Sequence, residues 1–239
     1  MSTLNLNNAN ALYYGDTQAQ KLYKGSELLY PELNTDPYYN DVLLYLKGDD
    51  FTDSSPNPKT VNLSTGSIIN TSIKKYGSGS FDFRNGNSFL SINNANLWLN
   101  NFLSLTIEFW YYCTLHSSDT GILQFDGTLS YQNMWRFYDS AQLNYLGNSS
   151  PQRIFITNRP LNTWIHCAII HDNGAYRYYQ NGILQGGANP SAIPTVGLLR
   201  IGTYGSDYPS RGFIDSFRIT EAIRYTSDFN PETDTYLAY

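Results

Sequence analysis

Apolar and polar residues alternate with a period of two in many short segments of this chain. Such alternation is typical of strands that place one face on a core and the other face in water. Clusters of Gly, Pro, Asn, Asp and Ser separate the segments at intervals of roughly ten residues, a spacing that predicts a sandwich or a barrel. The predicted strands are VLLYL (42–46), SFDFR (80–84), SFLSI (88–92), LTIEFWYYC (105–113), GILQF (121–125), MWRFY (134–138), RIFIT (153–157), WIHCAIIH (164–171), YRYYQ (176–180), LLRIG (198–202) and GFIDSFRI (212–219).

Local turn signals add detail to this picture. Asn181-Gly182 separates YRYYQ from ILQG, and Asn followed by Gly favours the two positive-φ positions of a type I′ turn, so the sequence predicts a hairpin there. No segment sustains the 3.6-residue stripe of a long amphipathic helix, although residues 94–99 and 220–224 could each form one helical turn. This excludes parallel α/β folds.

The opening of the chain repeats itself, because residues 12–16 (LYYGD) return as residues 22–26 (LYKGS). Polar turn formers and a proline at residues 33–37 separate this region from the first strong strand. We expect LYYGD, KLYKGS and ELLYP to form a small antiparallel β meander, which would be marginally stable alone. The sequence therefore predicts an N-terminal attachment element (1–36) and a main domain (37–239).

Composition narrows the classes of function. Charged residues make up only 15% of the chain, against ~25% in typical soluble domains, whereas tyrosine alone contributes 21 residues. The net charge is -5 and Lys74-Lys75 is the only adjacent basic pair, so nucleic-acid binding has no concentrated electrostatic source. The opening lacks the features of a secretory signal, and no apolar run reaches the ~20 residues needed to span a membrane. Cys113 and Cys167 each lie in an apolar run, which indicates buried free thiols and synthesis in a reducing compartment.

From residue 41 onward the chain resembles the laminin G-like domains of the concanavalin A-like lectin and glucanase superfamily. It is especially similar to the versions found in structural proteins of tailed bacteriophages, whose short N-terminal phrase the opening repeat also resembles. The resemblance implies an all-β, two-sheet antiparallel jelly-roll sandwich with a curved, concave face. It rests on an ordered set of phrases: VLLYLKGDDFTDSSPNPKTV (42–61), KKYGSGSFDF (74–83), FLSLTIEFWYY (102–112), LNTWIHCAIIHDNGAYRYYQNGIL (161–184), LLRIGTYG (198–205) and GFIDSFRITEAIRYTSDFNPET (212–233).

The resemblance also implies a function, that of a non-enzymatic virion surface protein. Such a protein would be either a capsid decoration protein or a tail-fibre or adsorption appendage, made in the host cytoplasm and displayed on the virion. Residues 1–36 would bind other virion proteins, the lectin-like sandwich would bind host-surface glycans, and a tail appendage would usually form a homo-oligomer. The alternative is a secreted carbohydrate-binding module or a glycoside hydrolase of the same superfamily.

Catalytic motifs argue against an enzyme. Glycoside hydrolysis needs two carboxyl groups roughly 5 to 9.5 Å apart. Hydrolases of this superfamily typically carry them in a Glu-x-Asp-x-Glu phrase, which this sequence lacks. Of five glutamates, only Glu108 lies within a strong predicted strand, where we interpret it as solvated or hydrogen-bonded. The chain also has no Gly-x-Ser-x-Gly elbow and no His-x-x-x-His zinc spacing, so no catalytic residue is predicted.

Calcium and sugars are the candidate ligands. Laminin G-like domains commonly hold one Ca²⁺ ion between the first and last strands, where Asp49 and Asp215 fall, so the resemblance implies these two as ligands of a structural ion. The alternative is that the carboxylates only form turns or bond backbone amides. For glycans, the loop at 203–212 offers Tyr204, Asp207 and Tyr208, residue types that stack on sugar rings and bond hydroxyl groups.

Overall fold

The structure is a computed structural model of the 239-residue chain. The chain divides into two compact units, one formed by residues 1–37 with 232–239 and the other by residues 38–231. In the segment before residue 36, only the backbone of short strands is described. The residues that the structure describes are 13–14, 17–18, 22–24, 27–30, 36–86, 88–99, 104–125, 134–146, 152–189, 197–205 and 208–231.

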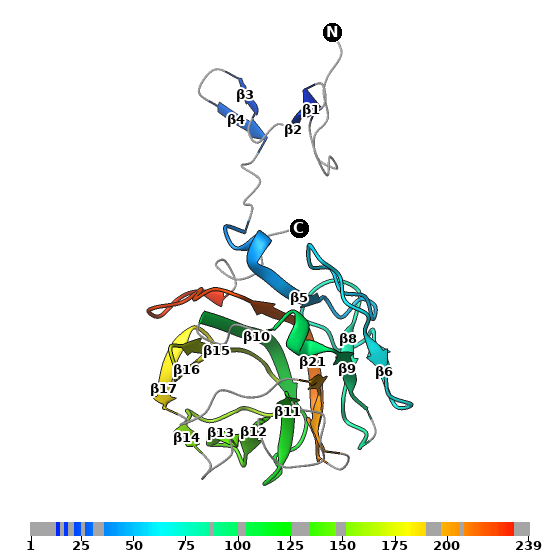
Figure 1. Cartoon of the computed structure of the whole chain (residues 1–239), viewed down its shortest axis with the longest axis vertical. Helices are drawn as coiled ribbons and strands as arrows, with labels where there is room; N and C mark the ends of the chain where they lie inside the picture. Colours follow the sequence, from blue (N-terminus) through cyan, green and yellow to red (C-terminus); the bar gives the residue numbers. More distant parts are fainter. Residues whose placement is uncertain are drawn as a thin grey trace. The chain divides into compact units, whose positions relative to one another are not determined.

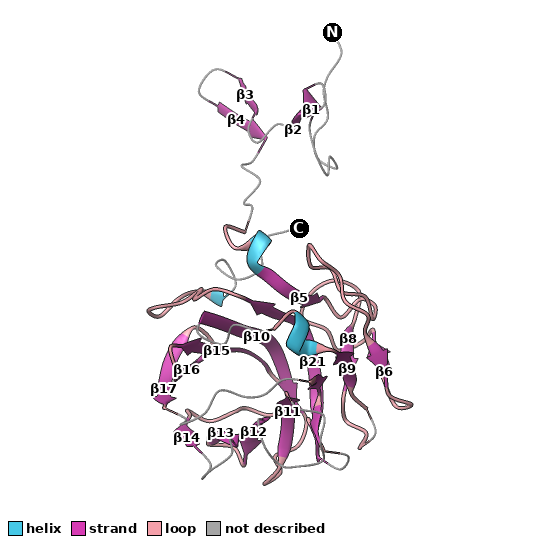
Figure 2. Ribbon diagram, in the orientation of Figure 1, coloured by secondary structure: helices cyan, strands magenta, loops and turns pink. Residues whose placement is uncertain are grey.

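The described part of the unit 38–231 consists mainly of strands and loops, with only short pieces of helix between them (Figure 2). One group of strands is β5 (Val42–Leu46), β7 (Ile68–Asn70), β8 (Ser80–Asp82), β10 (Ser104–Cys113), β15 (Trp164–Asp172), β16 (Ala175–Gln180), β17 (Ile183–Ala188) and β21 (Gly212–Thr220). A second group is β6 (Asn62–Leu63), β9 (Leu90–Asn93), β11 (Thr120–Gln124), β12 (Met134–Tyr138), β13 (Gln142–Leu146), β14 (Gln152–Phe155) and β18 (Leu198–Ile201). The remaining elements are the hairpin strands β19 (Thr203–Tyr204) and β20 (Tyr208–Pro209) and the 3-10 turns η1 (Tyr39–Asp41) and η2 (Ala95–Leu97).

These two groups form two antiparallel sheets (Figure 1). In the described residues, the eight-stranded sheet has the order β17-β16-β15-β10-β21-β8-β7, with β5 also paired to β21. The seven-stranded sheet has the order β14-β13-β12-β11-β18-β9-β6. Figure 1 shows β15, β16 and β17 in one layer and β12, β13 and β14 in the layer that faces it. The predicted fold class, an all-β two-sheet antiparallel sandwich, is confirmed.

The core lies between the two sheets, because alternate residues of each strand point inward. Leu105, Ile107 and Phe109 of β10 belong to it, as do Trp135 and Phe137 of β12. Both cysteines of the chain are free and buried, as the sequence predicted. Among the described residues, no helix has the length and apolar character needed to cross a membrane.

The predicted hairpin at Asn181-Gly182 is confirmed. β16 pairs with β17, and the two turn residues have φ values of 51° and 77°. A Cβ atom at Gly182 would lie 1.8 Å from the carbonyl oxygen of Phe229, so the turn packs too closely against the 221–231 segment for any side chain. Gly182 is therefore needed for two reasons: its φ is positive, and the Phe229 carbonyl leaves no room for a side chain.

The opening repeat differs from the predicted meander. β1 (Tyr13–Tyr14) pairs with β2 (Thr17–Gln18), and β3 (Leu22–Lys24) pairs with β4 (Glu27–Tyr30), giving two separate two-stranded sheets. In these described strands, each copy of the repeat supplies the first strand of its own hairpin, and no pairing between the two copies is found. The attachment role and the boundary at residue 36 stay predictions.

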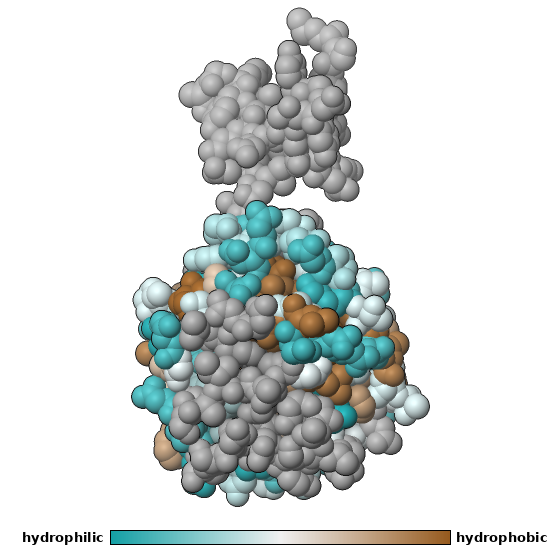
Figure 3. Space-filling view, viewed as in Figure 1, coloured by the Kyte–Doolittle hydropathy of each residue, from teal (hydrophilic) through white to brown (hydrophobic). Residues whose placement is uncertain are grey.

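Polar residues dominate what is visible of the surface. In Figure 3, teal and pale residues of the unit 38–231 surround small brown patches. Leu97, at 73% exposed, and Phe155, at 70%, have the largest exposed fractions among the large apolar side chains of the described residues. An isolated exposed leucine is ordinary, but an exposed aromatic ring on a sheet calls for a physical explanation.

Candidate functional site

The outer face of the seven-stranded sheet, turned away from the core, carries an ordered set of polar and aromatic side chains. Alternate residues of β12, β13 and β14 point into the core, so the residues between them point outward. Cross-strand pairing places the outward residues in two rows. One row contains Tyr138, Gln142 and Phe155, and the other contains Arg136, Asn144 and Arg153. We call these six residues, with Arg200 of the neighbouring strand β18, the seven-strand face.

Two exposed aromatic rings mark the first row. Tyr138 is 38% exposed and Phe155 is 70% exposed, and both pair across the sheet with Gln142, which lies between them. The backbones of β12 and β14 are two strand spacings apart, about 10 Å. This separation suits a flat ligand of one or two rings that contacts both side chains.

Several polar atoms of the seven-strand face have no hydrogen-bond partner within the described part of the chain. They are Gln142 Oε1, Asn144 Oδ1, Arg136 Nε, and Arg200 Nε and Nη1, and all are buried. Asn144 is only 2% exposed. Leaving a buried polar atom without a partner costs about 1 to 3 kcal/mol, so such atoms mark places where water or a ligand completes the bonding.

Arg136 is held in place by a group that sequence reasoning missed. Arg136 Nη1 donates to Asp119 Oδ1 and lies 3.2 Å from the hydroxyl oxygen of Tyr204, which itself donates to Asp119 Oδ1 at 2.7 Å. The outward position of Arg136 in the alternating segment MWRFY was a signal for a surface cation. Its partner Asp119 lies in a loop 17 residues earlier, and only the fold brings the two together.

The predicted ligand residues Tyr204 and Tyr208 lie next to this group. Their rings stack with centroids 4.4 Å apart and an interplanar angle of 10°. Tyr204 is 2% exposed, so the half-buried Tyr208 is the member of the pair whose ring reaches the surface. Asp207 lies outside the described residues. Ligand binding by these three residues stays a prediction.

The two predicted calcium ligands lie on neighbouring parts of the structure. Asp49 follows β5, Asp215 lies within β21, and these strands pair. Asp215 Oδ2 accepts the backbone N–H of Lys75 at 2.7 Å and of Tyr76 at 3.2 Å. Asp49 Oδ1 accepts the backbone N–H and the hydroxyl of Ser78. Both carboxylates therefore anchor the 75–79 loop, and its N–H and O–H groups compete with a cation for the same oxygen atoms.

The electrostatics of this pair are compatible with a cation but do not supply a full site. Burial raises the pKa of Asp215 to about 6, although the N–H groups of Lys75 and Tyr76 oppose the shift, and the nearby Asp49 adds to it. Ca²⁺ takes six to eight oxygen ligands. Within the described ranges, no group of three or more His, Cys, Asp or Glu residues could hold a metal ion. Calcium binding by Asp49 and Asp215 stays a prediction.

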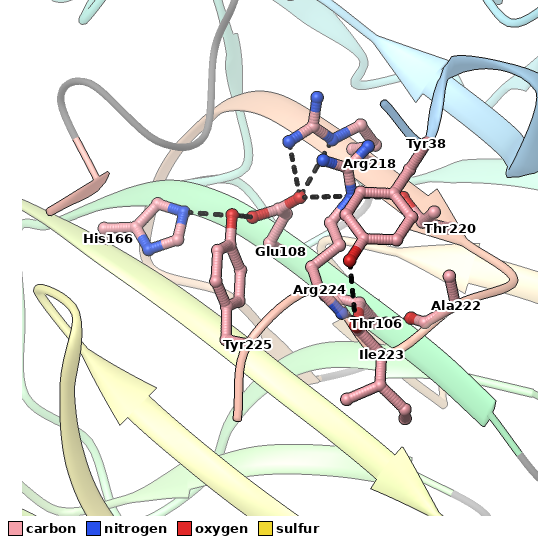
Figure 4. Close-up of polar contacts among 10 residues, drawn as sticks. All are labelled: Tyr38, Thr106, Glu108, His166, Arg218, Thr220, Ala222, Ile223, Arg224 and Tyr225. Carbon is pink, nitrogen blue, oxygen red and sulfur yellow. Dashed lines mark hydrogen bonds and ion pairs between the residues drawn. The ribbon is translucent and has the colours of Figure 1, made fainter. Parts of the chain in front are cut away.

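Glu108, the one glutamate in a strong predicted strand, is sealed on the outer face of the eight-stranded sheet (Figure 4). Arg218 Nε and Nη2 donate to Glu108 Oε1 at 2.8 and 2.6 Å, and the Tyr225 hydroxyl donates to Oε2 at 2.8 Å. Burial alone would raise the pKa of Glu108, but Arg218, with Arg224 and His166, outweighs it and holds the pKa well below its usual range. Glu108 is therefore an ionised structural residue, with neither the proton nor the access that a general acid needs.

Solved structures show how widely this fold is shared. Domain 4 of AbnA, a GH43 extracellular arabinanase from Geobacillus stearothermophilus, in complex with arabinotriose, has a TM-score of 0.62 and 18% identity, covering 83% of this chain and 98% of that one. The botulinum neurotoxin type G receptor binding domain has a TM-score of 0.56 and 17% identity, covering 80% and 49%. The binding domain of botulinum neurotoxin DC in complex with SialylT has a TM-score of 0.59 and 13% identity, covering 81% and 49%.

These likenesses show the fold alone, and this chain spans about half the length of the toxin domains. A comparison with curated proteins finds no match. The family model described as the concanavalin A-like lectin/glucanases superfamily matches residues 84–225, which is more than half of the chain. The chain therefore belongs to the concanavalin A-like lectin/glucanases superfamily.

Proposed function

We propose that this protein is a non-catalytic glycan-binding domain whose ligand lies on the seven-strand face. The observation that carries the proposal is the row in which Gln142 stands between the exposed rings of Tyr138 and Phe155. Beside it lies the amide oxygen of Asn144, which has no hydrogen-bond partner in the described part of the chain. Sugar rings stack their C–H faces on aromatic side chains, while their hydroxyl groups donate to amide oxygens. The face offers both kinds of group within the span of a short oligosaccharide.

The relatives support a saccharide as ligand. The arabinanase domain was solved with arabinotriose and the neurotoxin DC binding domain with SialylT. Those ligands belong to those proteins, and we extend only the class, carbohydrate, to this chain. A non-catalytic role is supported by Glu108, whose two carboxylate oxygens are occupied by Arg218 and Tyr225.

The location that we propose is the virion surface of a tailed phage, with residues 1–36 binding other virion proteins. This part rests on the resemblance of the opening repeat and of the sandwich phrases. Mass spectrometry of purified particles should find the protein, and deletion of residues 1–36 should leave a folded sandwich that no longer assembles on particles. Particles that carry the truncated protein at the normal level would exclude the attachment role.

A second candidate is the carbohydrate-binding module of a secreted enzyme. It is favoured by the arabinanase domain, because this chain covers 98% of that domain but only half of the toxin domains. The glycan-binding face would be the same in both cases. Absence of the protein from particles, together with binding to a polysaccharide, would favour the module.

Glycan-array binding tests the face itself. Phe155→Ala and Tyr138→Ala should each weaken binding by about fivefold to 150-fold, since loss of a stacking ring costs on the order of 1 to 3 kcal/mol. Tyr39→Ala is the matched control, because Tyr39 is 40% exposed but lies on η1, next to the eight-stranded sheet. Equal binding by all three variants would overturn the proposed face.

A further inference from the structure

The two sheets carry different charges on their strands. The described strands of the seven-stranded sheet contain three arginines, Arg136, Arg153 and Arg200, and no lysine, aspartate or glutamate. The described strands of the eight-stranded sheet contain four carboxylates and two arginines. The whole chain has more acidic than basic residues, 20 against 15. The cationic character of the seven-strand face therefore runs against the charge of the protein.

These three arginines differ in what they bind. Arg136 is neutralised by Asp119. Arg153 is exposed, and neither Arg153 nor Arg200 has an ion-pair partner in the part of the chain that the structure describes. Arg200 is half-buried, and its buried Nε and Nη1 atoms have no acceptor among the residues that the structure describes. A buried guanidinium N–H without an acceptor is costly, and a carboxylate or sulfate group fits its planar fork.

The neighbouring residues define where such a group would lie. Arg153 pairs with Asn144 across the sheet, and Arg200 pairs with Gln124, which pairs in turn with Met134 of β12. Both arginines therefore point from the same outer face as Tyr138 and Phe155. Counted along the strands from the aromatic row, Arg153 lies one row away and Arg200 lies two rows away in the same direction. A ligand stacked on the aromatic row therefore extends toward both cations from one side of that row.

We propose that the ligand of the seven-strand face is an acidic saccharide, one that carries carboxylate or sulfate groups, bound through Arg153 and Arg200. This inference rests on the proposed function, since it names the sugar class that the same face selects. Two separated arginines, with no basic run beside them, offer too few phosphate contacts for a nucleic acid. They suffice to select an acidic oligosaccharide over a neutral one.

Calorimetric titration with paired ligands tests the inference. One pair is a trigalacturonate and its methyl ester, and the other is a sulfated galactan oligosaccharide and its desulfated form. The acidic member of at least one pair should bind the wild-type protein about tenfold or more tightly than its neutral partner, and 0.5 M salt should reduce that preference. The pair that shows the preference identifies carboxylate or sulfate as the group bound.

Arginine variants assign the preference to the face. Arg153→Gln and Arg200→Gln should each weaken binding of the acidic ligand about tenfold and of the neutral ligand less than twofold. Arg177→Gln is the control, because Arg177 lies on β16 of the other sheet and pairs with Asp172 near the surface. Arg153 is exposed, so its variant should fold normally even if the Arg200 variant does not.

Failure of this inference is distinct from failure of the proposed function. Equal binding of acidic and neutral sugars, unchanged by the arginine variants but weakened by Phe155→Ala, would overturn the acidic class and leave glycan binding in place. Binding of no saccharide, acidic or neutral, in the titrations and on the array would overturn both. Binding of single-stranded DNA in preference to every sugar would also overturn the inference.

Discussion

The two outer faces of the sandwich use polar residues in opposite ways. On the eight-stranded sheet, Glu108 and Arg218 are fully buried, bonded to each other, and covered by the segment that carries Tyr225. On the seven-stranded sheet, Asn144 is nearly as buried, yet its side-chain oxygen has no partner in the described chain. Within the described chain, the protein itself bonds both oxygens of the Glu108 carboxylate, whereas it supplies no partner for the side-chain oxygen of Asn144.

If the proposed function holds, the two outer faces divide stability and binding between them. A buried ion pair whose oxygens are all bonded fixes the position of the segment that covers it. A face that leaves buried acceptors without partners in the described chain gives up some stability, which a bound ligand would restore. Substitutions that remove groups from each face in turn test this comparison.

The largest effect is expected for Glu108→Ala. It leaves the Arg218 guanidinium buried without its carboxylate, which costs about 3 to 5 kcal/mol of unfolding free energy. Urea denaturation measures this loss. Asp172→Ala is the matched control, because its ion pair with Arg177 is partly exposed and should contribute less than about 1 kcal/mol. Equal losses of unfolding free energy in the two variants would show that the buried Glu108–Arg218 pair is no more stabilising than the surface pair.

Below the ordinary pKa of histidine, the buried His171 should destabilise the protein, which limits the pH range in which the two faces can be compared. Burial lowers the pKa of His171 to about 4, with the neighbouring Asp172 opposing the shift. The folded state then binds fewer protons than the unfolded state between the ordinary pKa of about 6.5 and 4. Stability that is present above pH 6.5 should fall by roughly 2 to 3 kcal/mol as the pH drops to 4. A His171→Phe variant that keeps the same slope in pH-dependent denaturation would assign the effect to another group.

The turn that contacts the covering segment provides the next test. Gly182→Ala should destabilise by roughly 2 kcal/mol or more, because the new Cβ meets the carbonyl oxygen of Phe229 and the residue has a positive φ. Gly174→Ala separates the two causes, since Gly174 has φ +87° with nothing within 4 Å of a Cβ, and should cost only about 1 kcal/mol. Similar melting temperatures for the two variants would show that the contact with Phe229 is unimportant.

Calcium is expected to change stability less, through Asp49, which follows β5, and Asp215 of the eight-stranded sheet. If Asp49 and Asp215 hold an ion of the affinity common in extracellular domains, 10 mM Ca²⁺ should add roughly 1 to 3 kcal/mol, or a few degrees of melting temperature, relative to a chelator. Asp49→Asn should abolish this difference, because the amide oxygen still accepts the Ser78 N–H but carries no charge. Identical melting of the wild-type protein in calcium and chelator would leave the carboxylates only their loop-anchoring role.

The smallest change in stability is expected for Asn144→Ala on the seven-strand face. Because Asn144 Oδ1 has no partner in the described chain, its removal should alter the unfolding free energy by less than about 1 kcal/mol in either direction. Sugar affinity should nonetheless fall, since the oxygen is one of the proposed ligand contacts. A loss as large as that of Glu108→Ala would show that both faces are structural.

Prediction from sequence succeeded where the signal is local. The segment MWRFY coincides with β12, and GFIDSFRI lies within β21, because alternation over a few residues is enough to define a half-buried strand. β13 was missed because Gln142 and Asn144 give it a polar outer row that is typical of loops as well as strands. The Asn181-Gly182 turn was found because two adjacent residues determine its backbone.

The candidate site was harder to predict. Tyr208 was singled out by residue type, but Phe155 was not, since an aromatic residue in a strand is normally placed in the core. Its exposure follows from the register of β14 with β13, in which Phe155 lies opposite Gln142. Register depends on pairing between strands and cannot be read from one strand alone.

The sequence by itself determined the class of structure, because the period-two pattern and the turn residues act over short distances. It also determined the likeness to laminin G-like domains and the shortage of charge. Only the tertiary structure decided which polar groups found partners. Glu108 bonds Arg218 across 110 residues of chain, while on the opposite sheet Asn144 Oδ1 and the Nε and Nη1 atoms of Arg200 have no hydrogen-bond partner among the described residues. The physical reason is that hydrogen bonds between distant segments depend on strand register and on which segment covers each face, and neither is encoded in a local pattern.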